Sequence, residues 1–537
     1  MAIRKGELDS KKPTQKWKWL AFDSATNDNL RTSRQLRPRK NTGQTMRKPL
    51  QSIFVFLFVC LIGATSGGFF GSTVIGNDDA DTAVTNSTQP NVLFLFADDY
   101  SFDSVHVTGN KEIQTPNLDG LARSGTIFTH AYNMGAWGGA VCVASRTMLN
   151  TGRFVWNARK LKLKDEQANG RVWSQQMKSA GYETYFTGKW HVGGLKPTEV
   201  FEHTGHIRGG MPRQTPSGYD RPIDGKPDQW SPYDKSKGGF WEGGKHWTEV
   251  VGDDAVGFLS TAAKSDKPFF MYIAFNAPHD PRQSPKEFVD KYPADKILIP
   301  KDFLTTYPYH KKIGCGPSLR DEKLAPFPRT EHAVQVNRQE YYAIITHLDV
   351  QIGRILEALE ASGKSDNTIV FFTADHGLAV GHHGLIGKQN MYDHSVRVPF
   401  FVRGPGVATG KRLNTRIYLQ DIMPTTMKLA GIEKQDFVQF KDLSGLLDGS
   451  TTDHYKATYG GYRNLQRMVT RGDMKLILYP TIPKMRLYNL KTDPLEMNDM
   501  AGSPEQADTI KSLFATLLEL QKENGDELDL KAAFPKM

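Results

Sequence analysis

Cys142 begins a five-residue run whose side chains could do more than pack. The run is Cys142-Val143-Ala144-Ser145-Arg146. A lone cysteine is usually a small buried apolar residue, but that simple interpretation leaves the serine and arginine beside the sulfur unexplained. Residues 146–149 are typical of a short helix. We therefore expect Cys142 at or just before the amino end of a helix, where free backbone N–H groups favour an anion.

The run resembles the maturation sequence of type I sulfatases, Cys-x-(Pro or Ala)-Ser-Arg, in which an enzyme oxidises the cysteine to formylglycine. The resemblance implies that Cys142 becomes an aldehyde, which hydrates to a geminal diol. One hydroxyl would attack sulfur and expel the alcohol, leaving a covalent sulfate ester on the enzyme. The second would lose its proton as the adduct collapses and sulfate leaves. The implied partner is a formylglycine-generating or other sulfatase-maturing enzyme in the producing cell.

The net charge of the chain is concentrated at its N-terminus. The 537 residues are enough for two domains, or for one large α/β unit with an appendage. Residues 1–50 hold 13 lysines and arginines against 4 acidic residues, which is most of the net charge of +10. The rest of the chain is near neutral, and we expect no nucleic-acid partner.

An apolar stretch at 53–62 is too short to span a bilayer as a helix and is typical of a signal-peptide core. Ala64 and Ser66 are small residues suited to a cleavage site. We predict a leader and signal peptide at 1–66, an exported protein, periplasmic or secreted, and no stable membrane span after leader removal. Met46 is a more natural start than Met1. The alternative is a short buried strand or a membrane anchor.

The small number of cysteines after the predicted leader indicates a protein without a disulfide framework. Only Cys142 and Cys315 follow the leader. Oxidation of Cys142 would leave Cys315 without a partner, so the exported protein must rely on its core, which its size allows.

Apolar strands alternate with helices after a polar linker at 67–90. Residues 92–97 are continuously apolar, as expected for a strand buried on both faces of a parallel sheet. The alternation predicts a doubly wound, mostly parallel α/β domain at 91–445. Its expected strands are 91–97, 182–186, 268–275, 368–373 and 398–402, and its expected helices are 116–123, 174–180, 339–361 and 421–430.

A composition shift at 446–452 marks the start of a predicted smaller C-terminal α+β subdomain, 446–537. Short alternating segments there predict antiparallel strands, followed by a helix at 503–522. The phrase Asp493-Pro494-Leu495-Glu496 resembles the ending of sulfatases. The resemblance thus extends from Asn91 to about residue 525 and implies an alkaline phosphatase/sulfatase-like fold.

Polar side chains follow three of the expected strands where each strand ends: Asp98-Asp99, His279 and Asp375-His376. Ligands of such sheets bind beyond the carboxyl ends of the strands, so these side chains can converge. Clustered carboxylates repel one another unless a cation neutralises them, and oxygen-rich clusters suit Ca²⁺ or Mg²⁺. The alternative for any single Asp-Asp pair is a solvated loop or a helix cap.

The resemblance assigns these residues to a metal site. Asp98, Asp99, Asp375 and His376 match the metal quartet of the sulfatases, whose metal is usually Ca²⁺, with residue 142 beside it as a further ligand. Many members carry Asn where this chain has His376, whereas the branch that resembles iduronate and choline sulfatases carries His. The nitrogen donor leaves Ca²⁺ and other divalent ions open.

The resemblance also assigns five cationic residues to the sulfate. Arg146 would orient the diol. Lys189 and His191, in the run Gly-Lys-Trp-His, match groups that contact sulfate oxygens and the formylglycine hydroxyl. His279 and Lys388 match groups that bind sulfate and protonate the departing oxygen. Charge that accumulates on sulfuryl oxygens and on the leaving alcohol needs such fixed donors and a general acid.

Residues 199–250 are too long for a plain connection and are expected to form loops of the substrate pocket. Aromatic faces and cations would suit a sulfated sugar; the equal alternative is that the aromatics pack this segment onto the core. The run 277–282 looks like that of sulfatases acting on carbohydrates, which favours a sulfated carbohydrate over a phenolic sulfate. The aromatic and basic residues are Tyr219, Trp230, Tyr233, Phe240, Trp241, Trp247, Arg208, Arg213, Arg221, Lys245 and His246.

The sequence favours a sulfuric ester hydrolase and leaves two other functions open. One is a phosphate or phosphonate ester hydrolase of the same superfamily, since sulfate and phosphate are nearly isosteric. The other is a non-catalytic protein that binds sulfated glycans, if Cys142 is not oxidised.

Overall fold

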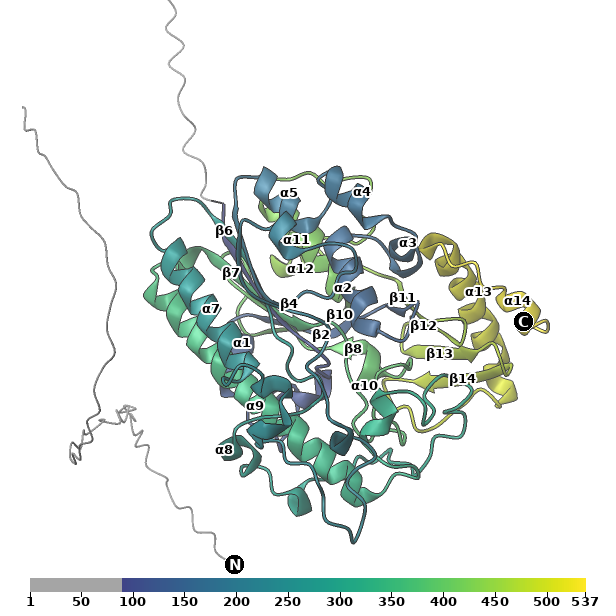
Figure 1. The fold of residues 1–537 in the computed structure, drawn as a ribbon. Helices are drawn as coiled ribbons and strands as arrows, with labels where there is room; N and C mark the ends of the chain where they lie inside the picture. The colour runs from purple at the N-terminus through teal and green to yellow at the C-terminus, as the bar shows by residue number, and fades with distance from the viewer. Residues whose placement is uncertain (1–88) are drawn as a thin grey trace, which may run out of the picture. The chain divides into compact units, whose positions relative to one another are not determined.

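The computed structural model describes residues 89–537 (Figure 1). The predicted leader, the signal peptide and most of the linker lie outside the described residues, so cleavage and export stay predictions. Among the helices of residues 89–537, none combines the length and the apolar character that a membrane span needs.

A mostly parallel sheet forms the central layer, as predicted, and it has nine strands. Its order is β10-β2-β9-β7-β1-β6-β4-β5, with β8 paired to β2. Only β8 and β9 run against their neighbours in this sheet. The strands are β1 (Asn91–Ala97), β2 (Thr126–Tyr132), β4 (Glu183–Lys189), β5 (His203–Arg208), β6 (Phe269–Ala274), β7 (Thr368–Ala374), β8 (Arg397–Val398), β9 (Phe400–Arg403) and β10 (Lys411–Tyr418).

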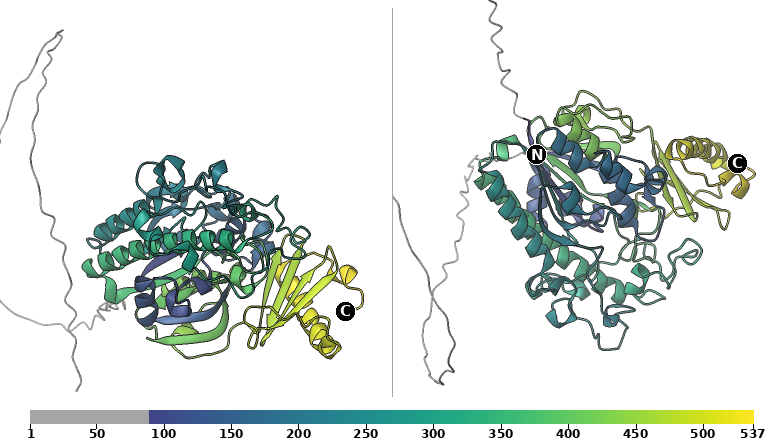
Figure 2. Two further views of the ribbon diagram at one scale, coloured as in Figure 1. Left: turned by 90° about the horizontal axis from the view of Figure 1, so that it is seen from below. Right: turned by 45° about the horizontal axis from the view of Figure 1, so that its top comes forward.

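The middle strands are buried because helices cover both faces of the sheet (Figures 1 and 2). All seven residues of β1 are buried, and β1 pairs in parallel with β7 and β6. Such strands must be apolar on both faces. One face carries α1 (Pro116–Arg123), α7 (Trp247–Ala262) and α9 (Glu331–Ala361), and the other carries α2 (Val141–Thr151), α5 (Trp173–Ser179), α11 (Ile422–Leu429) and α12 (Ser444–Leu447).

A second, five-stranded sheet follows along the chain, with the order β14-β13-β12-β11-β3. Its last strand, β3, comes from the segment just before α2 and pairs in parallel with β11. The predicted antiparallel strands and terminal helix are present, and α13 packs on β11 and β12 (Figure 2). The elements are β3 (Gly135–Ala136), β11 (Ala457–Tyr462), β12 (Gln466–Arg471), β13 (Met474–Tyr479), β14 (Lys484–Asn489), α13 (Ala507–Asn524) and α14 (Leu530–Ala533).

Several elements differ from the sequence expectation. Helix α9 begins at Glu331, eight residues before the expected 339, because Thr330 caps it by accepting a 3.1 Å hydrogen bond from Ala333 N. Residues 199–250 are not only loops, since they contribute β5 and the start of α7. The remaining short helices are α3 (Val155–Arg159), α4 (Leu163–Ala168), α6 (Pro197–Val200), α8 (Lys286–Val289) and α10 (Asp393–Val396).

Gly188 lets β4 pass close to β6 and so places Lys189 at the edge of the sheet, and a substitution can test this role. Its φ is +94°, and a Cβ there would lie 1.7 Å from Ala274 O. Gly188→Ala should lower the free energy of unfolding by about 2 kcal/mol or more, measured by urea titration. Gly193→Ala is the matched control, since a Cβ there meets nothing within 4 Å. Equal urea midpoints for the two variants would contradict this account of Gly188.

Candidate active site

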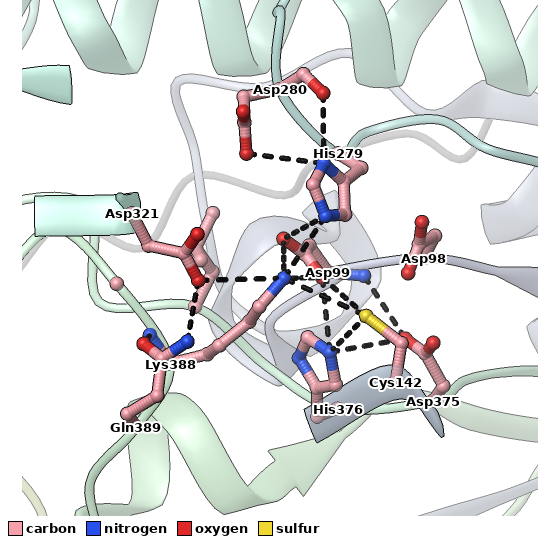
Figure 3. Close-up of polar contacts among 12 residues, drawn as sticks. Asp98, Asp99, Cys142, His279, Asp280, Asp321, Asp375, His376, Lys388 and Gln389 are labelled. Atoms are coloured by element: carbon pink, nitrogen blue, oxygen red, sulfur yellow. Dashed lines mark hydrogen bonds and ion pairs between the residues drawn. The ribbon is translucent and has the colours of Figure 1, made fainter. Parts of the chain in front are cut away.

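The carboxyl ends of β1 and β7 meet at one edge of the sheet and bring four polar side chains together (Figure 3). Asp99 N donates a 3.2 Å hydrogen bond to Asp375 Oδ1. Asp99 has φ +64°, a left-handed conformation that aspartate tolerates better than most residues. The Tyr341 hydroxyl donates to Asp99 O at 2.7 Å and fixes this turn. The predicted group Asp98, Asp99, Asp375 and His376 therefore converges.

Cys142 lies in the first turn of α2 and points into this cluster. Its sulfur is 3.3 Å from His376 Nε2 and 3.9 Å from Asp99 Oδ1. The residue is 2% exposed, so it lies on the floor of the site rather than at the molecular surface. The helix begins at Val141, which places residue 142 among the free N–H groups of the first turn.

The cluster fits a divalent cation. One possible ligand atom from each of Asp98, Asp99, Cys142, Asp375 and His376 lies within 4.8 Å of all the others. Within residues 89–537, the buried Asp98 Oδ1 has no hydrogen-bond partner. His376 Nδ1 donates to Gly377 O at 2.8 Å, which turns Nε2 toward the carboxylates. Buried carboxylate oxygens without donors and an oriented imidazole are what a metal site requires.

Cationic side chains hold the same carboxylates from the other side. Lys388 Nζ lies 2.7 and 2.8 Å from the Asp99 carboxylate oxygens. Lys189 pairs with Asp98. Both lysines are buried. Since an ammonium has three donors, each lysine can contact a carboxylate and a bound anion together.

Arg146 completes the pairing from within α2. Its Nε lies 2.9 Å from Asp375 Oδ2, and its Nη1 donates to Lys189 O at 2.7 Å. The guanidinium also lies 4.7 Å from the centre of the Phe96 ring. A fully buried arginine in these contacts orients its neighbours, so Arg146 fixes the geometry beneath residue 142.

The charges perturb the ionisation of the cluster. Burial alone would raise the pKa of the Cys142 thiol, but Lys189, Lys388 and His376 outweigh it and hold that pKa well below its usual range. Burial, with Asp375 and Cys142, raises the pKa of Asp98 well above its usual value. Burial would lower the pKa of His376, yet Asp375 and Asp99 raise it to about 9. Burial is thus the main cause of the raised pKa of Asp98, whereas neighbouring carboxylates are the cause of the raised pKa of His376.

A cavity of about 250 Å³ opens above Cys142. His191, His279 and Lys388 line it, and Gly210 and Met211 form another part of its wall. His279 Nε2 lies 3.2 Å from Lys388 Nζ. All ten residues singled out from the sequence thus gather at this cavity or directly beneath it: Asp98, Asp99, Cys142, Arg146, Lys189, His191, His279, Asp375, His376 and Lys388.

Four polar residues at the site were missed in the sequence. Asp280 O accepts a 2.8 Å bond from His279 Nδ1, and its carboxylate pairs with Arg320. Asp321 Oδ2 lies 3.7 Å from Lys388 Nζ and accepts a 2.6 Å bond from Gln389 Nε2. Asp280 and Gln389 directly follow the predicted residues His279 and Lys388, and this adjacency could have identified them as site residues. Arg320 and Asp321 lie in a stretch without a recognisable motif, so nothing in the sequence indicates their place at the site.

The aromatic residues of 199–250 mostly pack rather than line the cavity. Trp230, Phe240, Trp241 and Trp247 are buried. Arg208 stacks on Trp247, with its guanidinium carbon 4.3 Å from the ring centre. For these residues the packing alternative is the better description.

The fold and the cluster at its strand ends define an α/β enzyme with an alkaline phosphatase-like fold. The chain belongs to the sulfatase family, because residues 90–432 match the Sulfatase family model. Residues 381–523 match the model described as N-sulphoglucosamine sulphohydrolase, C-terminal. The protein is therefore a sulfatase by family.

Relatives of known name extend over most of the chain. An ulvan-active sulfatase of Formosa agariphila is 27% identical over 463 residues, 82% of each chain. The N-acetylglucosamine-6-O-sulfatase of Bacteroides thetaiotaomicron is 27% identical and covers 82% of this chain and 87% of its own.

Solved structures share the fold. One, in complex with its substrate D-glucosamine-2-N,6-O-disulfate, has a TM-score of 0.63 and 25% identity, and covers 82% of this chain and 99% of its own. The phosphonate monoester hydrolase of Agrobacterium radiobacter has a TM-score of 0.63 at 20% identity, with 81% and 96% covered. The second likeness concerns the fold alone.

Removing one carboxylate from the cluster should weaken metal binding. Asp375→Asn is expected to lower Ca²⁺ affinity by at least about 100-fold, measured by calorimetric titration and by the metal content of the purified protein. Asp290→Asn, a change of an exposed aspartate paired with Lys286, should leave both unchanged. Full metal content and parental affinity in Asp375→Asn would remove this residue from the site.

Proposed function

We propose that the protein hydrolyses a sulfate ester of a sulfated carbohydrate and releases inorganic sulfate. The observation that carries the proposal is the position of Cys142. Its buried sulfur lies beside His376 and Asp99, on the floor of a cavity whose walls carry His191, His279 and Lys388. A tetrahedral dianion or monoanion over residue 142 would meet donors on several sides.

Residue 142 would supply the nucleophile after a sulfatase-maturing enzyme has converted the cysteine to formylglycine. The hydrated aldehyde has one hydroxyl to attack sulfur and a second whose deprotonation expels sulfate by breaking the carbon–oxygen bond. Arg146 would hold the residues beneath it in place through Asp375 and the Lys189 carbonyl. His191 lies beside residue 142, and its buried Nδ1 has no hydrogen-bond partner within residues 89–537.

The leaving group and the sulfate oxygens need separate donors. His279 donates through Nδ1 to Asp280 O, so its Nε2 faces the cavity and can protonate the departing alcohol. Lys189 and Lys388 would contact sulfate oxygens while keeping their carboxylate partners. Asp98, Asp99, Asp375 and His376, with the oxygens of residue 142, would hold a divalent cation, we infer Ca²⁺. Bound there, it would polarise a sulfate oxygen.

The substrate class is inferred from relatives and the cavity. The names of two relatives refer to ulvan and to N-acetylglucosamine-6-O-sulfate, and a structural neighbour of 25% identity holds a sulfated glucosamine. The predicted signal peptide further supports export to the periplasm or medium, where polysaccharides are accessible. N-terminal sequencing of the mature protein tests the export step.

Replacing the nucleophile should abolish turnover without unfolding the protein. Cys142→Ala is expected to lower the rate of sulfate release by at least about 1,000-fold, measured by ion chromatography, with the urea midpoint retained. Cys315→Ala is the matched control, since this second buried cysteine lies outside the cluster. Parental turnover in Cys142→Ala would refute the assignment of the nucleophile.

Conversion of Cys142 to formylglycine can be measured by mass spectrometry of the peptide that contains it. In active protein, the peptide that contains residue 142 should be about 18 Da lighter than the thiol form. An untouched thiol in protein from a cell that contains a maturing enzyme would favour the non-catalytic binding alternative.

The alternative function is hydrolysis of phosphate or phosphonate esters, since sulfate and phosphate are nearly isosteric. We expect kcat/KM for 4-nitrophenyl sulfate to exceed that for 4-nitrophenyl phosphate or phenyl phosphonate esters by at least about 100-fold, which is about 2.7 kcal/mol of transition-state discrimination. The measurement is made on one metal-loaded preparation. A reversed ratio would assign the protein to phosphorus esters instead.

A further inference from the structure

A second hollow of about 550 Å³ adjoins the cavity above Cys142. The two hollows share Gly139 and Leu319 in their walls. We call the second hollow the outer groove. Its other lining residues include Lys311, Gly314, Gly316, Ser318, Tyr462 and Arg463. A hollow of this size can hold a small organic ligand such as a sugar unit.

The outer groove is cationic. Lys311 and Arg463 are both exposed, and no carboxylate lines the groove. Within residues 89–537, neither forms an ion pair with an aspartate or glutamate. The inner cavity differs, because its Arg320 is occupied by Asp280 and Asp321. The two cations of the outer groove are therefore free to pair with an anion from outside.

The walls of the groove are held in fixed relation to the inner cavity. Gln466 Nε2 donates at 2.8 Å to both Ile313 O and Gln389 O, which ties the Lys311 loop to the residue that follows Lys388. On the opposite chain segment, Arg463 N donates to Ala136 O at 2.9 Å. The groove is thus pre-organised, which reduces the entropy lost on binding.

Arg463 has a backbone conformation that side chains seldom adopt. Its φ is +49°. Besides its bond to Ala136, its carbonyl accepts a 2.6 Å bond from Arg467 Nη1, and Arg467 is anchored by Asp526. Left-handed conformations at residues other than glycine persist where the surroundings impose them, and they gather at ligand sites. Here the imposed turn presents a guanidinium at the groove.

We propose that the outer groove binds a second anionic group, a sulfate or a carboxylate, on the sugar unit next to the one whose sulfate lies over residue 142. The protein would then act on segments of an acidic polysaccharide rather than on isolated monosulfated sugars. This rests on the proposed function for the place of the first sulfate. Two exposed cations bind weakly alone, but an anion tethered to an already bound sugar meets them at high effective concentration.

The test measures equilibrium binding of saccharides to the full chain carrying Cys142→Ala, which prevents turnover. The variants are Lys311→Gln, Arg463→Gln and their combination, and the matched control is Lys312→Gln, an exposed neighbour outside the groove lining. The probes are a heparin hexasaccharide, its carboxyl-reduced form, its desulfated form that keeps the carboxylates, and glucosamine 6-sulfate.

The combined variant should bind the heparin hexasaccharide about tenfold more weakly, and the Lys312→Gln control within about twofold of the parent. Affinity for glucosamine 6-sulfate should be the same in all. A loss that persists with the carboxyl-reduced probe identifies sulfate as the second anion, and a loss that persists only with the desulfated probe identifies carboxylate.

The proposal is overturned if the combined variant loses no more affinity than Lys312→Gln, or if the parent binds none of the three hexasaccharides. Release of inorganic sulfate from the heparin hexasaccharide and from glucosamine 6-sulfate by the chain that keeps residue 142 is measured separately. Sulfate release without weaker hexasaccharide binding in the combined variant refutes this inference alone, whereas weaker binding in that variant without any sulfate release by the parent refutes the proposed function alone.

Discussion

Buried like charge is the constraint on which this structure depends. Asp98, Asp99 and Asp375 are fully buried within one cluster, where like carboxylates repel strongly and desolvation opposes ionisation. Lys189, Lys388 and Arg146 each pair with one of these carboxylates, yet Asp98 Oδ1 has no hydrogen-bond donor among residues 89–537. A divalent cation bound in the cluster would contact that oxygen. The same carboxylates therefore serve both the ion pairs and the metal site, and the ends of the central strands place them.

The smaller sheet also helps to position the charged residues of the site. Lys475 of β13 is buried and lies 2.8 Å from both Asp393 Oδ1 and Glu496 Oε1. This pairing, with hydroxyl contacts such as Tyr307 to Tyr392 at 3.0 Å, holds the chain that runs from His376 through Lys388 to α10. Lys388 therefore owes its position to residues far along the sequence. Long-range packing, not local propensity, sets the upper wall of the cavity.

The sequence was informative where local pattern and site chemistry coincide. Strand β1 and the pair Asp98-Asp99 could be predicted because a buried parallel strand is apolar throughout and its ligands follow its end. The edge strands β5 and β10 were missed, since half-exposed strands carry a mixed pattern. Asp321 and Arg463 could not be found at all. Their roles come from partners that only the folded chain brings near, and neither lies in a periodic segment.

The pairing of β3 with β11 has a consequence for the order of events in the cell. Gly135 and Ala136 precede the reactive cysteine by a few residues, yet their strand partner is near the end of the chain. During synthesis from the ribosome, the segment around residue 142 must wait for residues 457–462 before its surroundings close. Because the finished fold leaves that side chain 2% exposed, the maturing enzyme that we propose would have to act on it during this delay.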